Sequence, residues 1–190
     1  MQDEAKGLYD RLHEIHIEYF HVWKSTIFLS WRWWVGVGLI VIPWVVWLIV
    51  RKRGSTSRLL FVGAFIGLLA SFLDMVGVAL HLWYYPVTVF PLMPSFIPFD
   101  LSALPVTAML WVQCFPKVRP IIKAIAFAVT GGFVFEPVCV RLGLVAHVRW
   151  EYWLTALALF FIYLLANFLS ERRSFQPISD HHESNGQEES

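Results

Sequence analysis

The sequence predicts an all-α protein: a polytopic helical membrane bundle of about five transmembrane helices, preceded by an N-terminal amphipathic helix. Three observations support this prediction. Hydrophobic residues make up 57% of the 190 residues. Charged residues make up only 15%, against roughly 25% in soluble domains. The apolar residues also fall into long runs, separated by short polar, aromatic or proline-rich stretches.

The length of the chain suits a single domain. The formal net charge is only +1, and no basic block is longer than Arg51-Lys52-Arg53. Nucleic-acid binding calls for a strongly basic surface, so no nucleic-acid partner is predicted. The predicted partner is the lipid bilayer.

Residues 1–30 are predicted to form an amphipathic helix that lies at the membrane interface and leads into the first span. Apolar side chains recur at helical spacing on one face, among them Leu8, Leu12, Ile15 and Tyr19. The start, residues 1–6, is acidic rather than basic, so we expect no cleaved signal and a first span that remains as an anchor. The histidines of this helix lack a close third ligand, so no metal site is predicted.

Residues 31–170 are predicted to form the transmembrane domain, and residues 171–190 a disordered cytoplasmic tail. The third predicted span, residues 101–115, is about 15 residues long and covers about 22 Å of a ~30 Å hydrocarbon core. The apolar, proline-rich segment before it is expected to dip back toward the membrane, shielded by protein. The spans are predicted at about 35–50, 59–83, 101–115, 121–145 and 152–170.

Positive charges gather on one side of this five-span layout. That side holds the connections 51–58 and 117–123 and the start of the tail, whereas the other side holds fewer Lys and Arg residues. The positive-inside rule therefore predicts an outside N-terminus and a cytoplasmic C-terminus.

Ionisable residues inside the apolar runs are the candidate functional residues. Such a group costs roughly 2.5–3.5 kcal/mol at mid-bilayer, so it is normally paired, protonated or in contact with water. Asp74 and Glu136 are each expected about 22 Å from the inner face, and His81 follows Asp74 on the same helix face. Asp100 is expected to cap the third helix. The predicted outward-facing, ligand-binding pocket consists of Asp74, His81, Asp100, Glu136 and Arg141.

Three classes of function fit this pattern. The first is binding or passing a small ligand or ion in the pocket. The second is an intramembrane enzyme that acts on a lipid-like substrate, with the carboxylates as acid and base. The third is a structural or accessory subunit, or a homo-oligomer, because small residues let helices approach closely. Its candidate docking faces are Gly63/Gly67 and Gly131/Gly132. A purely structural role stays open for each buried charge taken alone.

No cofactor is predicted from the sequence. There is no phosphate-cradling glycine loop and no zinc-ligand spacing, and haem would need facing imidazoles inside the bilayer. Cys114 and Cys139 fall in different spans near opposite membrane faces, so both are expected to be free thiols.

Five segments of the chain resemble an uncharacterised family of small multi-pass membrane proteins of bacilli and clostridia. The resemblance covers residues 31–170 and implies a bacterial plasma-membrane location and the same span layout, but no activity. The segments are WRWWVG (31–36), RKRGSTSRLLFVG (51–63), SFLDMVGVALHLWYYP (71–86), PLMPSFIPFDLSALPVT (91–107) and FEPVCVRLGL (135–144).

Overall fold

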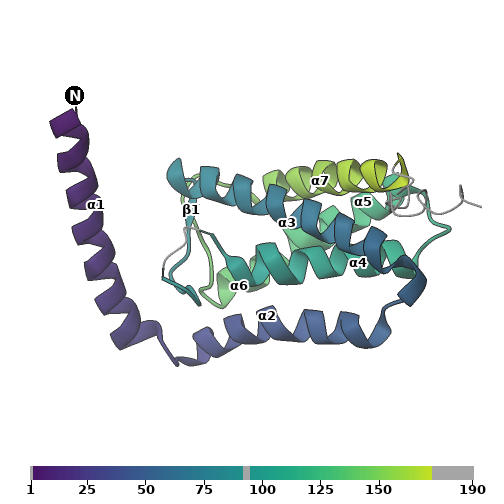
Figure 1. Cartoon of the computed structure of the whole chain (residues 1–190), viewed down its shortest axis with the longest axis horizontal. Coiled ribbons are helices and arrows are strands. Elements are labelled where there is room, and N and C mark those ends of the chain that lie inside the picture. The colour runs from purple at the N-terminus through teal and green to yellow at the C-terminus, as the bar shows by residue number, and fades with distance from the viewer. Residues whose placement is uncertain (1, 92–94, 173–190) are drawn as a thin grey trace, which may run out of the picture.

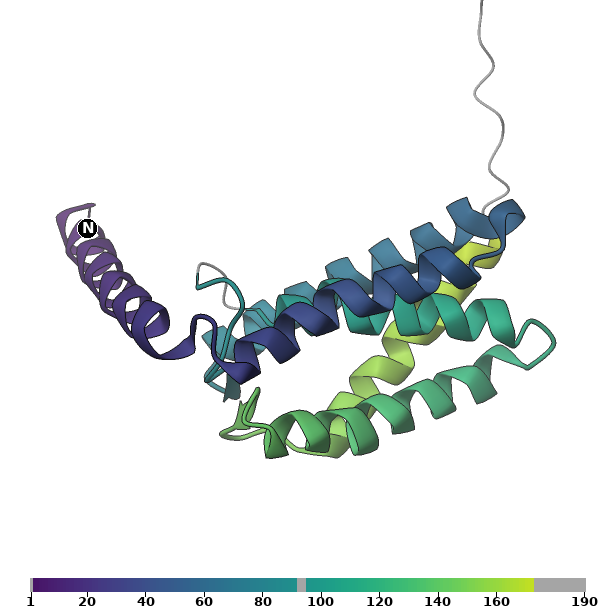
Figure 2. The ribbon, with the colours of Figure 1, turned by 90° about the horizontal axis from the view of Figure 1, so that it is seen from below.

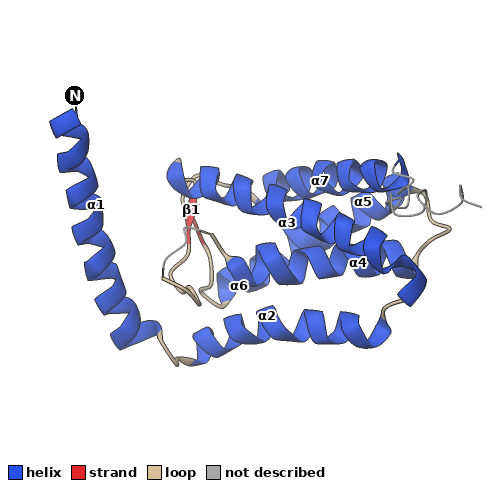
Figure 3. Ribbon diagram, viewed as in Figure 1, coloured by secondary structure: helices blue, strands red, loops and turns tan. Residues whose placement is uncertain are grey.

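The computed structural model describes residues 2–91 and 95–172. It is an all-α bundle with a single two-stranded β pairing in the described part (Figure 3). Four helices there are long and apolar enough to cross a membrane, and a shorter apolar helix covers Phe99–Cys114. The predicted fold class is therefore confirmed. The predicted third span is the short helix, as its length indicated. The tail 171–190 lies almost wholly outside the described residues.

Helix α1 (Gln2–Val22) extends away from the bundle (Figure 1). It continues into the π-helical turn η1 (Trp23–Ile27), and none of the described α1 residues is buried. Contact with the bundle is made at its C-terminal end. There the Tyr19 hydroxyl lies 2.9 Å from the Thr88 hydroxyl, and Trp23 Nε1 donates to the Thr88 carbonyl at 2.8 Å. The position of α1 at a membrane interface stays a prediction.

Helix α2 (Trp31–Val50) begins at Ser30, whose side chain accepts a hydrogen bond from the Trp33 amide. Its buried residues are Gly36 and Trp47, so most of its surface is available to lipid. It packs on the segment 99–114, where the Ser102 hydroxyl donates to the Ile40 carbonyl at 2.7 Å.

Helix α3 (Thr56–Ala79) shows why the small-residue face matters. Gly63, Gly67, Ala70, Asp74 and Gly77 are all buried, whereas the opposite face is largely exposed. A Cβ at position 63 would lie 2.8 Å from Met109 Sδ, and one at position 67 would lie 3.1 Å from the Asp100 carbonyl. The first predicted glycine face therefore packs against the helix that covers 99–114.

The segment after α3 does not continue as a helix. The predicted second span reached residue 83, but α3 ends at Ala79 because His81 adopts a left-handed backbone with φ 55°. Strand β1 (Trp83–Tyr84) then pairs antiparallel with β2 (Ala146–His147). Val87, Thr88, Val89 and Phe96 of the following loop are buried, in agreement with the prediction that protein shields this segment.

The segment 99–114 consists of the π-helical turn η3 (Phe99–Ala103) and helix α4 (Leu104–Cys114). Asp100 does not cap this helix, which corrects the prediction. The turn begins after Pro98, and the Asp100 amide already donates to the Phe96 carbonyl at 3.0 Å. Asp100 is therefore inside the helical segment, and its carboxyl group is directed to tertiary contacts rather than to the helix end.

Residues Pro120–Arg141 form one membrane-length helix in three parts: α5 (Pro120–Val129), the π-helical η4 (Thr130–Phe135) and α6 (Glu136–Arg141). Pro137 has no N–H to donate to the Phe133 carbonyl, which explains the widened turn before it. The helix ends four residues before the predicted boundary at 145. Gly143 takes φ 70°, and the Leu144 amide bonds back to the Cys139 carbonyl at 2.9 Å.

Helix α7 (Tyr152–Arg172) crosses between the α3–α4 pair and the α5–α6 helix (Figure 2). The main core lies where α3, α4, α5 and α7 meet, and includes Ile66, Ala108, Phe127 and Tyr163. We call the end of the bundle that carries β1 and β2 the strand end. The opposite end, with the connections 51–55 and 115–119, is the basic end.

The second predicted glycine face, Gly131/Gly132, packs against α7. A Cβ at position 131 would lie 2.2 Å from Leu159 Cδ1, and one at position 132 would lie 2.8 Å from the Tyr152 carbonyl. Both predicted docking faces are thus used inside the chain. Self-association stays a prediction, but it would need other surfaces.

Candidate functional site

A cavity of about 270 Å³ lies near the strand end. Its walls come from α3, from the loop and turn 82–100, from the region of α6 and from the start of α7. Leu73 and Val76 line it and are also 39% and 36% exposed on the outer side of α3. The cavity therefore reaches the face of the bundle that would contact lipid acyl chains. Three carboxyl groups line it, from Asp74, Asp100 and Glu136.

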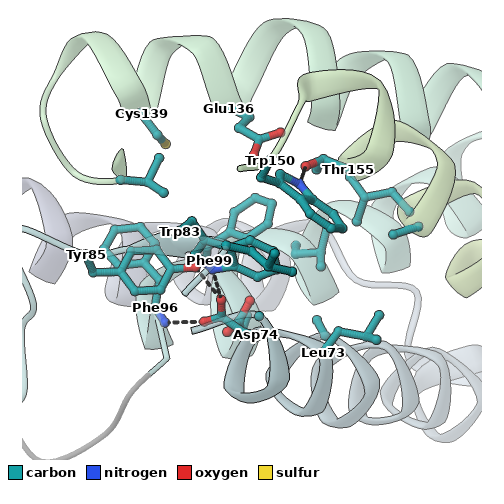
Figure 4. A pocket seen from close by; sticks show the side chains of 18 of the residues that line it. Leu73, Asp74, Trp83, Tyr85, Phe96, Phe99, Glu136, Cys139, Trp150 and Thr155 are labelled. Atoms are coloured by element: carbon teal, nitrogen blue, oxygen red, sulfur yellow. Dashed lines mark hydrogen bonds between the residues drawn. The ribbon is translucent and has the colours of Figure 1, made fainter. Parts of the chain in front are cut away.

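Asp74 anchors the loop that follows α3. Its Oδ1 accepts hydrogen bonds from Trp83 Nε1 at 2.7 Å and from the Tyr85 hydroxyl, and its Oδ2 accepts from the Phe96 amide at 2.8 Å (Figure 4). Asp74 itself is only 5% exposed. One side chain therefore holds three points of the segment 83–96 against the end of α3.

Asp100 is the second carboxyl group and is only 4% exposed. It interacts with Asp74, so two acidic groups from different helical segments face each other. Its Oδ2 is buried and has no hydrogen-bond partner in the described part of the chain. Two facing carboxyl groups repel when both are ionised, so this arrangement favours a shared proton or a bound cation.

Glu136 lies on the opposite wall from Asp74 (Figure 4). Its Oε1 lies 2.9 Å from His147 Nε2. Its Oε2 is buried and, among the described residues, has no hydrogen-bond partner. One oxygen atom of Glu136 is therefore held by the β2 strand, and the other remains able to accept a hydrogen bond from a ligand.

Aromatic rings separate the two acidic walls. Three ring pairs line this space: Trp83 with Trp150 at 4.7 Å between centroids, Phe99 with Phe135 at 5.0 Å, and Tyr85 with Phe96 at 5.2 Å. Burial raises the pKa of the Tyr85 phenol well above 10, and the charges of Asp74 and Asp100 raise it further. Tyr85 is therefore a protonated hydrogen-bond donor at neutral pH.

The structure brings together three of the five predicted site residues: Asp74, Asp100 and Glu136. His81 and Arg141 are exposed and do not line the cavity. His81 leaves the Asp74 face because the helix has already ended, and Arg141 is the last residue of α6.

Five polar residues of the site were not predicted to belong to it: Trp83, Tyr85, His147, Trp150 and Thr155. The sequence placed Trp83 and Tyr85 only in an interfacial girdle. No spacing rule connects a carboxylate with side chains nine and eleven residues later, beyond the end of its helix. The antiparallel register, with Trp83 opposite His147, brings Trp83 to the cavity and His147 to Glu136.

Among the described residues, no three His, Cys, Asp or Glu side chains are grouped so that they could hold a metal ion. Cys114 is exposed and Cys139 is buried, and both are free thiols, as predicted.

Comparison of the chain with protein-family models, with curated proteins and with solved structures gives no match. The interpretation of the cavity therefore depends on its own chemistry.

His147 gives this site a pH dependence that can be measured. Burial lowers the pKa of His147 from its ordinary value of 6.5, and the nearby Glu151 opposes the shift. The unfolded chain takes up this proton as the pH falls through about 6.5, but the folded protein takes it up only at lower pH. Stability from neutral His147 is therefore present above about pH 6.5 and is lost below it.

We expect the melting temperature of the wild-type protein to fall more between about pH 6.5 and pH 5.5 than that of His147→Gln. Thermal unfolding in one detergent at both pH values measures this difference. His81→Gln is the matched control because His81 is an exposed histidine near the same end, and it should follow the wild type. An equal fall in His147→Gln and the wild type would contradict the assignment.

Proposed function

We propose that this membrane protein binds a small, largely apolar ligand that carries a cationic or hydrogen-bond-donating group. The main support is that three carboxyl groups from separate segments line one aromatic cavity that has no Lys or Arg in its lining. Two of these groups, Asp100 and Glu136, each keep a buried oxygen atom without a partner within the described residues. Such atoms are costly to bury unless a donor reaches them.

The aromatic walls support the same ligand class. A cation within about 6 Å of a Trp, Tyr or Phe ring face is attracted by the ring quadrupole, and the gain is larger when the site excludes water. Trp83, Phe99 and Trp150 supply rings between Asp74 and Glu136 (Figure 4). A ligand with an apolar body and one ammonium group would match both features of the lining.

The exposed cavity-lining residues of α3 support entry of the ligand from the bilayer.

We further propose a plasma-membrane location, with the N-terminus and the strand end outside, because basic residues gather at the opposite end. In that orientation the cavity lies in the outer half of the membrane.

The proposal is tested with the benzylammonium ion and its uncharged isostere benzyl alcohol. We expect purified protein to bind benzylammonium more tightly, and Glu136→Gln to weaken that binding by about 30-fold or more. This follows because removing one member of a buried charge pair costs about 2–5 kcal/mol. Binding of benzyl alcohol should change little. Quenching of Trp fluorescence measures both, since Trp83 and Trp150 line the cavity.

Glu151→Gln is the matched control, because Glu151 is an exposed acid at the same end that does not line the cavity. It should bind both probes like the wild type. Equal binding of the two probes by the wild type, or an equal loss in Glu136→Gln and Glu151→Gln, would contradict the proposed site.

A second candidate function is acid–base catalysis on a lipid-like substrate. The observation that favours it is the contact between Glu136 Oε1 and His147 Nε2 at 2.9 Å. A carboxyl–imidazole pair next to an apolar cavity can move a proton to or from a substrate. Turnover of a membrane lipid that is lost in His147→Gln, with benzylammonium binding retained, would favour this alternative over simple binding.

A further inference from the structure

We infer that the ligand of the acidic cavity is a long-chain primary amine. Its ammonium group binds the carboxyl groups, and its hydrocarbon chain leaves the cavity sideways, between α3 and α7, into the bilayer. This ligand class, which rests on the proposed function, follows from two features of the cavity. One is the place where the wall opens, and the other is the set of wall atoms that lack a partner.

The wall of the cavity opens on its lipid side. Of the described residues that line the cavity, only Leu73 and Val76 are exposed, and both lie on α3. Toward the strand end the wall is formed by Trp83 and Trp150, whose ring centroids are 4.7 Å apart, and neither residue is exposed. Because α3 is one of the membrane-length helices, an opening beside Leu73 and Val76 faces acyl chains rather than water.

Helices α3 and α7 pack together near the middle of the bundle and separate toward the strand end (Figure 2). On α3 the exposed fraction rises along one helical stripe, from 0% at Ile66 through 8% at Ala70 to 39% at Leu73. On α7, Ile162 is 4% exposed, and Ala158, one turn nearer the strand end, is partly exposed. Leu73 and Ala158 also line the cavity, so the two helices bound an opening from the cavity to the bilayer.

The unpartnered oxygen atoms indicate a primary ammonium group. Asp100 Oδ2 and Glu136 Oε2 are buried and lack a hydrogen-bond partner among the residues that the structure describes. A primary ammonium group brings three N–H donors to such acceptors, whereas a quaternary ammonium group brings none. A quaternary group would be held only by its charge and by the aromatic rings. The cavity therefore favours an amine with N–H donors over a trimethylammonium group.

The charge of the lining does not suit an amine that also carries a phosphate group. No Lys or Arg lines the cavity, so a phosphate next to the ammonium group would be buried without a cation. Leu73 lies six residues before the end of α3 at Ala79, about 9 Å along the helix. An opening at that depth in the ~30 Å hydrocarbon core receives a hydrocarbon chain and not a charged headgroup. The ligand is therefore an alkylamine without phosphate.

The test uses octylamine with a photoactivatable diazirine group in the middle of its chain, and the purified protein in phosphatidylcholine nanodiscs. After irradiation, mass spectrometry of peptides locates the cross-links. We expect cross-links on α3 around Leu73 and on α7 around Ala158, reduced at least ten-fold by excess unlabelled octylammonium. Excess octanol should not reduce them. Octyltrimethylammonium should compete at least ten-fold less well than octylammonium, because it cannot donate hydrogen bonds to the carboxylates. Cross-links from octylamine that is merely dissolved in the bilayer are not competed.

Ala158→Phe places a ring in the opening and should lower the competed cross-links at least five-fold. Leu73→Trp should do the same, and Leu73 is exposed, so this second variant does not disturb the core. Leu157→Phe is the matched control, because Leu157 is the neighbouring residue of α7, is 47% exposed and does not line the cavity. It should keep the wild-type cross-links.

Competed cross-links that map to β1 or β2 instead would overturn the opening between α3 and α7. Equal competition by octyltrimethylammonium and octylammonium would overturn the primary amine. Benzylammonium binding without any competed cross-link would overturn the long-chain ligand and leave the proposed function standing. If benzylammonium does not bind and no cross-link is competed, the proposed function and the ligand class both fall.

Discussion

Asp74→Ala is expected to lower the free energy of unfolding by about 2–5 kcal/mol. The change leaves three donors without their acceptor: Trp83 Nε1, the Tyr85 hydroxyl and the Phe96 amide. At the average of about 0.6 kcal/mol per side-chain hydrogen bond in membrane proteins, three bonds sum to about 2 kcal/mol. At the largest value of about 1.7 kcal/mol per bond in a membrane protein, three bonds sum to about 5 kcal/mol. Reversible unfolding in mixed detergent micelles measures it.

Variants that remove one donor at a time serve as controls. Tyr85→Phe removes only the hydroxyl donor and should cost about 0.6–2 kcal/mol, well below the loss in Asp74→Ala. Asp74→Asn keeps an acceptor oxygen and should fall between the two. If Asp74→Ala unfolds like the wild type, the three bonds contribute nothing to stability. Asp74 would then be free for a purely functional role.

The sequence predicted the helical part of this fold well because the physical signals are local. A run of about 20 apolar residues identifies a membrane helix, and a 3.6-residue period identifies its packed face. The buried positions of α3, from Gly63 through Asp74 to Gly77, follow this period. The short third helix was also predictable from its length and from the prolines before it.

Helix ends were predicted less well because they depend on single backbone conformations. A left-handed φ at His81 ends α3, and a non-glycine residue gives no sequence signal for it. The same conformation at Gly143 has such a signal in the glycine itself, which marks a helix end. The prediction that extended the fourth span to 145 did not use that signal.

The candidate site was predicted in part. Asp74 and Glu136 were identified because their predicted depths in the bilayer agree. That depth follows directly from the rise per residue of a helix. Asp100 belongs to the site for a different reason from the predicted one, since it is inside η3 and not at a helix cap. His147 could not be assigned from the sequence. Its approach to Glu136 depends on the pairing of β2 with β1, which is a contact between distant segments.

Gly132→Ala is expected to lower the free energy of unfolding by about 1–3 kcal/mol, the range typical of overpacked sites. A Cβ at this position would lie 2.8 Å from both the Ala156 amide nitrogen and the Tyr152 carbonyl oxygen, which are backbone atoms of α7. A flexible side chain could move aside, but a helix backbone must shift as a unit. Because Gly132 lies four residues before Glu136, the shift should also weaken benzylammonium binding.

Gly38→Ala is the control, and it should change the free energy of unfolding in the opposite direction. The new Cβ would lie 3.5 Å from Ile42 Cδ1, an ordinary contact, so only the helix propensity changes. Replacing a helical glycine with alanine under those conditions should stabilise the protein by up to about 1 kcal/mol. Both variants are unfolded in the same mixed micelles, which makes their difference independent of the detergent. If Gly132→Ala stabilised the protein as Gly38→Ala does, α7 could not lie against η4 at this distance, and the cavity wall that Glu136 and Thr155 form would have to be placed differently.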